Sequence, residues 1–414
     1  MNYKMMGRFT AQILLMEGIF LIPAMFISLV CEEDAAVCGF LVTLGVIALL
    51  GIPMYLFCRD AKSAFYATEG MMCVAMSWFV LSLIGALPFY ISGAIPGYID
   101  ALFETVSGFT TTGASILPEV ESMAKGLLYW RSFTHWVGGM GVLVFLLAIA
   151  PTKGSEQGFT MHLLRAESPG PSVGKLVPKM RKTAGILYLL YIILTAVDFV
   201  LLLLGNMPVL DALCTAFGTA GTGGFGIKND SIASFSPYIQ NVTTVFMLLF
   251  GVNFSCYYLL TLRQVKSVFK DEELRLYIGI VLGSIALIVW NLWGYYPSFG
   301  ETLRHAAFQV SSVITTTGYA TTDFDLWPSF SKTILLCLMV VGACAGSTGG
   351  GIKVARVLLL FKSLRRSFLQ MLHPSRVQLV RNNDQVVDEK VVESTNAYLI
   401  AYVFILFLSF LVLS

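Results

Sequence analysis

The sequence predicts an all-α membrane protein built from repeated units, each a helix, a short half-helix, a polar loop and a second helix, preceded by an extra helix pair. Hydrophobic residues make up 56% of the 414 residues and charged residues only 13%, whereas soluble domains carry roughly 25% charged residues. Several apolar runs approach or exceed the roughly 20 residues that a helix needs to cross a bilayer. One kind of polar loop also occurs three times in register, which indicates a repeat architecture.

The chain begins with two apolar runs that we expect to form a helix pair. They cover residues 12–30 and 37–57 and are joined by a short acidic turn at residues 32–34. No polar loop of the repeated kind follows this pair. We therefore assign residues 1–62 to a separate N-terminal transmembrane helix pair.

Three copies of one segment mark the units that follow. They cover residues 100–114, 211–225 and 305–319 and read DALFETVSGFTTTGA, DALCTAFGTAGTGGF and HAAFQVSSVITTTGY. An alanine near the start and a glycine near the end occupy the same column in all three copies. Each segment is too short to cross the membrane as a helix and lies between two longer apolar runs, so we expect a half-helix followed by a polar loop.

The flanking apolar runs set the boundaries of these units. We predict a first repeat at residues 63–182 with spans at 71–91 and 129–150, a second at 183–272 with spans at 183–204 and 238–262, and a third at 273–392 with spans at 274–293 and from about Lys332. Residues 393–414 supply one further span, interpreted as the first helix of an incomplete fourth repeat. Since no fourth polar loop follows it, we expect the sequence to be C-terminally incomplete.

Lysine and arginine predict the orientation, because they concentrate in the short loops on the cytoplasmic side of a membrane. They cluster in alternate connections between the predicted spans. With the N-terminus inside, the cytoplasmic set is Lys4, Arg8, Arg59, Lys62, Lys153, Arg165, Lys175, Lys179, Arg181, Lys182, Arg263, Lys266, Lys270, Arg275, Lys362, Arg365, Arg366, Arg376 and Arg381. We therefore predict a multi-pass protein with a cytoplasmic N-terminus and polar loops that open to the exterior.

The composition of the polar loops favours contact with a cation. Non-helical backbone at membrane depth is tolerated only where it is buried in protein or lines water. Glycine permits unusual backbone angles, rings of carbonyl oxygens can replace the water shell of an ion, and each half-helix directs its negative C-terminal end toward the loop. The candidate residues are Thr110, Thr111, Thr112, Gly113, Thr222, Gly223, Gly224, Thr315, Thr316, Thr317 and Gly318. A single such loop is equally compatible with a re-entrant turn, but three copies in register favour a pore.

A second glycine-rich stretch lies in the returning helix of the third unit, at residues 342–353. Its sequence, GACAGSTGGGIK, places five glycines within ten residues, and each glycine destabilises a helix by about 1 kcal/mol relative to alanine. A phosphate-binding loop is excluded because no GK[ST] ends the stretch. A serine nucleophile at Ser347 has no general base nearby in sequence. We favour an intramembrane loop formed by Gly342, Gly346, Ser347, Thr348, Gly349, Gly350, Gly351 and Lys353.

The three loops TTTGA, GTGGF and TTTGY, each after a half-helix, resemble the filters of the Trk/Ktr/HKT potassium transporter superfamily. The extra helix pair in front is similar to its TrkH branch. The resemblance covers essentially the whole chain and implies a potassium-channel-like architecture of pore half-helices and filter loops. It also implies that Gly113, Gly224 and Gly318 mark potassium preference. By the same resemblance, carbonyls of Thr111, Thr112, Thr222, Gly223, Thr316 and Thr317 ring the ion.

The resemblance implies a physiological setting as well. It indicates potassium uptake across the cytoplasmic (inner) membrane, gated by the glycine-rich loop, by a homodimer that binds a cytosolic nucleotide-binding regulatory subunit such as TrkA. K⁺ is then the transported ion and the only metal expected at the filter. No cofactor bound by this chain and no nucleic acid partner are expected. Passive conduction and symport with protons or sodium are both compatible with these residues.

Two alternatives are kept beside this reading. A Ktr-type sodium-dependent potassium transporter subunit would differ in its accessory helices, and the helix pair at residues 1–62 favours the TrkH branch. A membrane-embedded enzyme would need a cluster of acids, bases or metal ligands within the spans. The chain has four histidines, His135, His162, His305 and His373, and no HExxH motif. We therefore expect no enzyme.

The sequence also predicts the surroundings of five further polar residues. Glu104 and Gln309 share one column of the half-helix, where bracing of the loops by hydrogen bonds and a solvated position at the pore mouth are equally compatible with the sequence. Asp198 lies inside an apolar span, where an ionisable residue is unfavourable without a partner, so we expect a basic or amide group beside it. Arg131 and His135, near the start of a returning span, are interpreted as residues of the membrane interface.

Overall fold

The computed structural model describes residues 3–60, 67–139, 141, 180–373, 378–383 and 385–413. These residues are largely helical, with one short hairpin of strands β1 (Arg381–Asn382) and β2 (Gln385–Val386). Six of the described helices are long and apolar enough to cross a membrane, and a bent helix pair raises that number to seven. The predicted all-α membrane fold is confirmed. Residues 142–179, which include the end of the span predicted at 129–150 and most of the inner connection after it, lie outside the described residues, as do Lys62 and Arg376.

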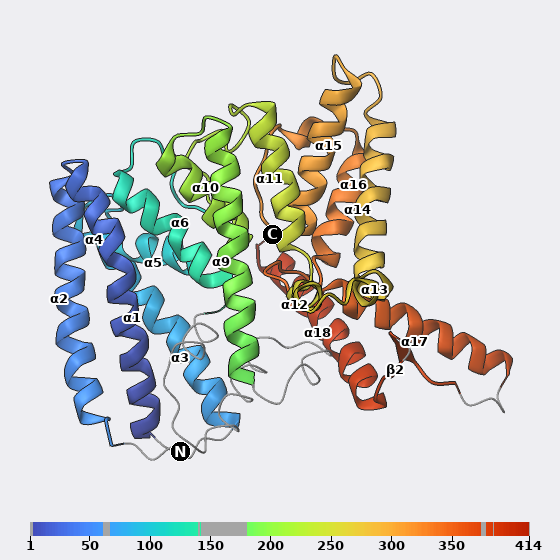
Figure 1. Cartoon of the computed structure of the whole chain (residues 1–414), viewed down its shortest axis with the longest axis horizontal. Coiled ribbons are helices and arrows are strands. Elements are labelled where there is room, and N and C mark those ends of the chain that lie inside the picture. The colour runs from blue at the N-terminus through green and yellow to red at the C-terminus, as the bar shows by residue number, and fades with distance from the viewer. Residues whose placement is uncertain are drawn as a thin grey trace.

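The N-terminal pair and the first unit form one side of the molecule, coloured blue to teal in Figure 1. Their helices are α1 (Tyr3–Val30), α2 (Asp34–Phe57), α3 (Ala67–Gly85), α4 (Leu87–Ile91), α5 (Tyr98–Phe109) and α6 (Lys125–Gly139). The short helix α5 is the first predicted half-helix. It ends immediately before the threonine run, as expected.

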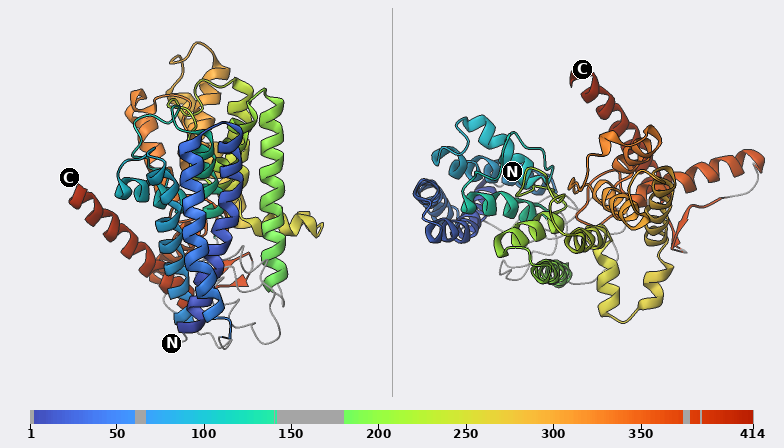
Figure 2. Two further views of the ribbon diagram at one scale, coloured as in Figure 1. Left: turned by 90° about the vertical axis from the view of Figure 1, so that its left-hand side faces the viewer. Right: turned by 90° about the horizontal axis from the view of Figure 1, so that it is seen from above.

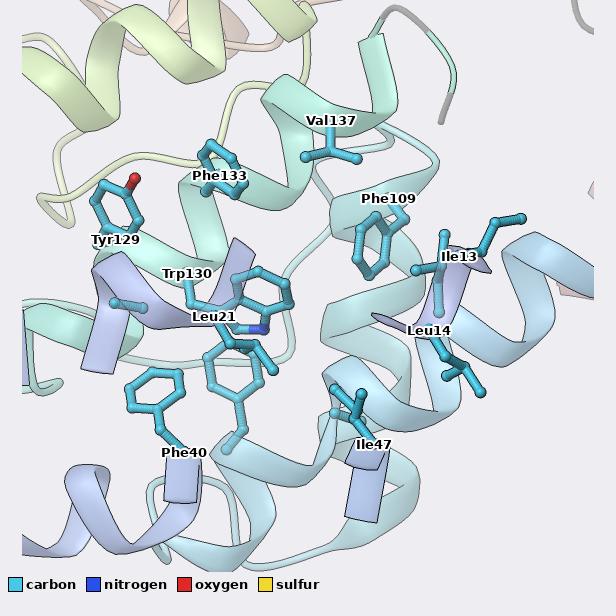
Figure 3. Packing of buried hydrophobic residues seen from close by; sticks show 14 of the residues in the cluster. Ile13, Leu14, Leu21, Phe40, Ile47, Phe109, Tyr129, Trp130, Phe133 and Val137 are labelled. Carbon is cyan, nitrogen blue, oxygen red and sulfur yellow. The ribbon is translucent and has the colours of Figure 1, made fainter. Parts of the chain in front are cut away.

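Apolar side chains of the N-terminal pair pack against the first unit. Figure 3 shows Leu21 of α1 and Phe40 of α2 gathered around Trp130 of α6. Trp130 is fully buried, and its indole N–H donates to the carbonyl of Gly85 at 3.0 Å. The close approach of α6 to α1 depends on Gly126, because small residues let helix backbones come together in membranes.

The second unit contains a break that the sequence did not predict. Its helices are α9 (Met180–Leu204), α10 (Val209–Gly221), α11 (Pro237–Phe250) and α12 (Phe254–Thr261). Residues 238–262 were expected to form one span, but α11 and α12 meet at 87°. Asn253 starts α12 by accepting the N–H of Ser255 on its side chain at 2.9 Å. The expectation of one continuous helix here is wrong.

The third unit follows on the other side of the second, so the three units succeed one another across the molecule (Figure 1). Its elements are α13 (Val265–Lys270), α14 (Glu272–Asn291), α15 (Phe299–Ile314), the 3₁₀ turn η2 (Phe324–Leu326), α16 (Ser329–Val341) and α17 (Val354–Leu372). Five glycines were expected to interrupt the returning helix, and α16 and α17 are indeed separate. Helices α17 and α18 (Glu389–Leu413) project away from the body (Figure 2).

We predict that Gly126→Ala separates the N-terminal pair from the first unit. A methyl group at this position would lie 2.6 Å from the carbonyl oxygen of Ala24 and would overlap the Ser28 hydroxyl. Overpacking of this kind destabilises proteins by about 1–3 kcal/mol, so the midpoint of thermal unfolding in detergent should fall by several degrees. Gly45→Ala is the matched control, because Gly45 lies in α2 with open space around it. Equal midpoints for both variants would contradict this packing.

Candidate functional site

The three half-helices end in the same backbone motif. Thr111, Thr222 and Thr316, one at each end, have left-handed φ values of 54°, 51° and 58°. The next N–H donates to the carbonyl five residues earlier, at 2.9, 3.0 and 2.8 Å, and the N–H of each threonine donates to the carbonyl three residues earlier. These two bonds define a Schellman motif, whose left-handed position is usually glycine.

A threonine at a left-handed position is a strained choice, because β-branched residues rarely adopt positive φ. Such strain is about 1–3 kcal/mol per residue and clusters at functional sites. The same strain at three equivalent positions therefore marks these loops as a site. The motif uses carbonyls of the last helical turn, and none of its bonds uses the carbonyls of Thr111 or Thr112.

Two of the three predicted glycines, Gly113 and Gly224, are where neighbouring loops touch, whereas Gly318 has open space around it. Gly113, Gly224 and Gly318 all have positive φ, at 73°, 80° and 87°. A side chain on Gly113 would overlap the carbonyl oxygen of Gly223, and one on Gly224 would overlap that of Thr317. The first loop therefore adjoins the second, and the second adjoins the third. Loops far apart in the sequence thus present their carbonyls side by side.

Two columns hold threonine in the first and third loops and glycine in the second, and this difference has a steric cause. In the first loop the hydroxyls of Thr110 and Thr112 lie 2.8 Å apart, and in the third Thr315 and Thr317 repeat the pair at 2.8 Å. The second loop has glycines in these two columns. There the ring of His135 fills the space, since a side chain on Gly223 would overlap it.

A buried ion pair ties the first loop to the second. Glu104 of α5 accepts the N–H of Ile116 at 3.0 Å and hydrogen bonds from the Ser115 hydroxyl, so it holds the chain that follows the first loop. Arg131 of α6 donates to Glu104 at 2.6 Å and to the carbonyl of Gly226, beyond the second loop, at 3.0 Å. The Arg131 and Glu104 side chains are 3% and 0% exposed. The predicted bracing by Glu104 is present.

The third loop is braced by related contacts. Gln309 donates to the carbonyl of Thr322 at 3.4 Å, and the Ser312 hydroxyl donates to the carbonyl of Tyr319 at 2.6 Å. The Tyr319 hydroxyl donates to the carbonyl of Phe225 in the second loop at 3.4 Å. The chain after each loop is therefore fastened either to its own half-helix or to its neighbour.

Two expectations about charged or polar residues are wrong. Arg131 and His135 were interpreted as interfacial, but both are buried, with the Arg131 guanidinium 3.6 Å from the centre of the Phe225 ring and the His135 ring 4.1 Å from it. Asp198 was expected to be paired, yet its carboxylate has no hydrogen-bond partner among the described residues.

The glycine-rich stretch lies between the third loop and the α11–α12 break. On one side, the N–H of Gly350 donates to the Thr316 hydroxyl at 2.7 Å. On the other, the N–H of Cys344 donates to the carbonyl of Gly251 at 3.1 Å, and the carbonyl of Gly346 accepts the N–H of Phe254 at 3.0 Å. The stretch therefore contacts the loops and the break together.

The other predicted residues of this stretch also form hydrogen bonds, some within the stretch and one to α11. Ser347 donates to the carbonyl of Cys344 at 2.6 Å, and Thr348 donates to the carbonyl of Phe250 at 3.3 Å. Lys353 donates to the carbonyl of Gly349. The turns need positive φ, found at Gly342, Gly346, Gly351 and Lys353. In the part of the chain that the structure describes, no group of three or more His, Cys, Asp or Glu residues could hold a metal ion.

Comparison with known proteins decides the family. Residues 40–414 match the family model TrkH, described as a cation transport protein. The chain belongs to the TrkH family. Among its TrkH relatives, the "Trk system potassium uptake protein TrkH" of Salmonella typhimurium is 36% identical over 96% of this chain and 83% of that protein. The protein of the same name from Escherichia coli (strain K12) is 35% identical over the same shares.

A solved TrkH structure has the same fold. The crystal structure of the potassium transporter TrkH from Vibrio parahaemolyticus superposes with a TM-score of 0.86 at 29% identity, covering 98% of this chain and 84% of that one. The family resemblance drawn from the three loops is therefore confirmed. This TrkH family chain is a multi-span membrane protein whose named relatives are transport proteins rather than enzymes.

We predict that Arg131→Gln destabilises the protein strongly. Removing one partner of a buried ion pair leaves the other charge uncompensated, which costs about 3–5 kcal/mol. The measurement is the midpoint of thermal unfolding in detergent. Arg304→Gln is the control, since its ion pair with Glu301 is partly exposed and spans 4.0 Å, and such pairs contribute only about 0–1 kcal/mol. A similar midpoint for the two variants would show that Arg131 does not hold the loops.

Proposed function

We propose that this chain takes up potassium ions across the cytoplasmic (inner) membrane through a filter formed by the carbonyls of the three loops. The observation that carries the proposal is their repeated geometry. Each loop contains a left-handed threonine, and Gly113 and Gly224 of the first two loops each lie directly against a carbonyl of the next loop. Rings of backbone carbonyls are the known basis of potassium selectivity, and the named TrkH relatives are potassium uptake proteins.

The filter in this proposal consists of the residues named from the sequence. They are Thr110, Thr111, Thr112, Gly113, Thr222, Gly223, Gly224, Thr315, Thr316, Thr317 and Gly318. The loop at residues 342–353 acts as the gate, and its bonds to Thr316 and to the α11–α12 break support that role. K⁺ is the transported ion, and no bound cofactor is needed.

The proposal includes an assembly and an orientation. The protein acts as a homodimer with a cytosolic nucleotide-binding subunit of the TrkA type, and its N-terminus is cytoplasmic. The excess of lysine and arginine in alternate connections supports this orientation. The relatives described above are named Trk proteins, which favours a Trk over a Ktr-type role.

We predict that Gly113→Ser and Gly224→Ser each lower the ratio of potassium to sodium flux in liposomes. The added side chain would displace the neighbouring carbonyl of Gly223 or Thr317, so the ratio should fall by about tenfold, equivalent to roughly 1.4 kcal/mol. Gly283→Ser, on an exposed face of α14 with open space around it, should leave the ratio unchanged. Unaltered discrimination in both filter variants would refute the filter assignment.

We predict that deletion of residues 346–349 raises potassium flux. A closed gate is the major state, and open states of such equilibria are commonly populated at about 0.1–10%, so flux should rise roughly tenfold or more. The measurement is initial potassium influx into liposomes at equal protein content. A lower flux would instead mean that the loop holds the pore together.

A further inference from the structure

The carboxylate of Glu273 forms a hydrogen bond with the glycine-rich loop rather than with the N–H groups of its own helix. An acidic residue in a first helical turn ordinarily interacts with the free N–H groups there. In α14 Asp271 already does so, accepting the N–H of Leu274 on its side chain at 2.8 Å. Glu273 instead accepts the N–H of Ala345 at 2.5 Å, and its carboxylate also contacts the Asn253 side chain and the Ala355 backbone. The Glu273 side chain is therefore available to the loop because its neighbour caps the helix.

This bond completes a row of three anchors on consecutive loop residues. Cys344 donates to the carbonyl of Gly251, Ala345 donates to Glu273, and Gly346 accepts from Phe254. The first and third anchors join backbone to backbone. The anchor at Ala345 is the one of the three that depends on a side chain.

The environment makes this bond strong. Glu273 is 7% exposed and Ala345 4% exposed, so water has little access to either. A buried N–H that loses its acceptor is unfavourable. Loss of the carboxylate would therefore favour movement of the inner half of the loop to a position where Ala345 is solvated.

We propose that Glu273 is a positioning residue that latches the glycine-rich loop beneath the third filter loop. The latch rests on the proposed function, because it takes this loop as the gate. With the latch closed, Glu273 holds the first half of the loop (the inner half) at Ala345, and the hydrogen bond from Gly350 to Thr316 holds its second half (the outer half). With the latch open, the hydrogen bond between Gly350 and the Thr316 side chain remains, and the bond between Ala345 and the Glu273 side chain is lost.

The test compares two adjacent carboxylates of α14 by potassium influx into liposomes. Glu273→Ala should raise influx about tenfold, because the buried N–H of Ala345 loses its acceptor. Glu273→Gln should stay within about threefold of the unmodified protein, since its amide oxygen can still accept the N–H of Ala345. Glu272→Ala is the matched control, because Glu272 pairs with Lys362. Unchanged influx in Glu273→Ala, or an equal rise in Glu272→Ala, would overturn the latch.

Two further measurements separate a latch from general destabilisation. Combined with the deletion of residues 346–349, Glu273→Ala should add nothing to influx, because the proposed latch acts on influx through the loop. A rise in the double variant beyond the deletion alone would overturn the proposal. Ser347→Cys, in a Cys38→Ser and Cys337→Ser background, should react faster with a thiol reagent when Glu273→Ala is present. An unchanged reaction rate would show that the loop has not moved.

The outcomes also distinguish the latch from the gate. If the deletion raises influx and Glu273→Ala does not, the gate stands and the latch is wrong. If the deletion does not raise influx, the gate itself fails and the latch fails with it. Size-exclusion profiles of all variants in detergent identify any that do not fold, and Glu273→Gln then supplies the loop-accessibility measurement in place of Glu273→Ala, with a smaller expected increase.

Discussion

The requirement that backbone polar groups be hydrogen-bonded at membrane depth governs this structure. The chain departs from the helix at the three threonine- and glycine-rich loops, at the α11–α12 break and at the glycine-rich stretch. In each place several of the released groups find partners within the protein. The Schellman motifs close the half-helices at Thr111, Thr222 and Thr316. Backbone groups at the α11–α12 break form hydrogen bonds with backbone groups of the glycine-rich stretch. Irregular backbone is thus concentrated where the segments can share hydrogen bonds.

This constraint also explains the choice of side chains around the loops. A half-helix that ends inside the membrane leaves the following chain without a regular partner, so side chains must replace it. Glu104 and Gln309 do so from equivalent positions of α5 and α15. Arg131 adds a link between units, and its buried charge is balanced by Glu104. The three loops are therefore held by polar contacts in addition to the apolar core.

The features carried by local composition were predictable from the sequence. The repeated loops were visible because three copies share one pattern, and the separation of α16 from α17 followed from five glycines. The break at Gly251 was missed because what shapes it is bonding to Cys344 and Gly346, some ninety residues away. The left-handed conformation of the three threonines could not be predicted for another reason, since glycine is the usual residue at that position. Burial of His135 depended on the packing of α6 against Gly223.

The mutual dependence of the α11–α12 break and the glycine-rich stretch has a consequence for biosynthesis. When the second unit leaves the ribosome, the carbonyl of Gly251 and the N–H of Phe254 still lack the partners that Cys344 and Gly346 later provide. The bend between α11 and α12 cannot reach its final hydrogen bonding until the third unit has entered the membrane. Maturation of the second unit therefore waits for translation of the third, and a nascent chain halted between them would keep an unfinished turn in the bilayer.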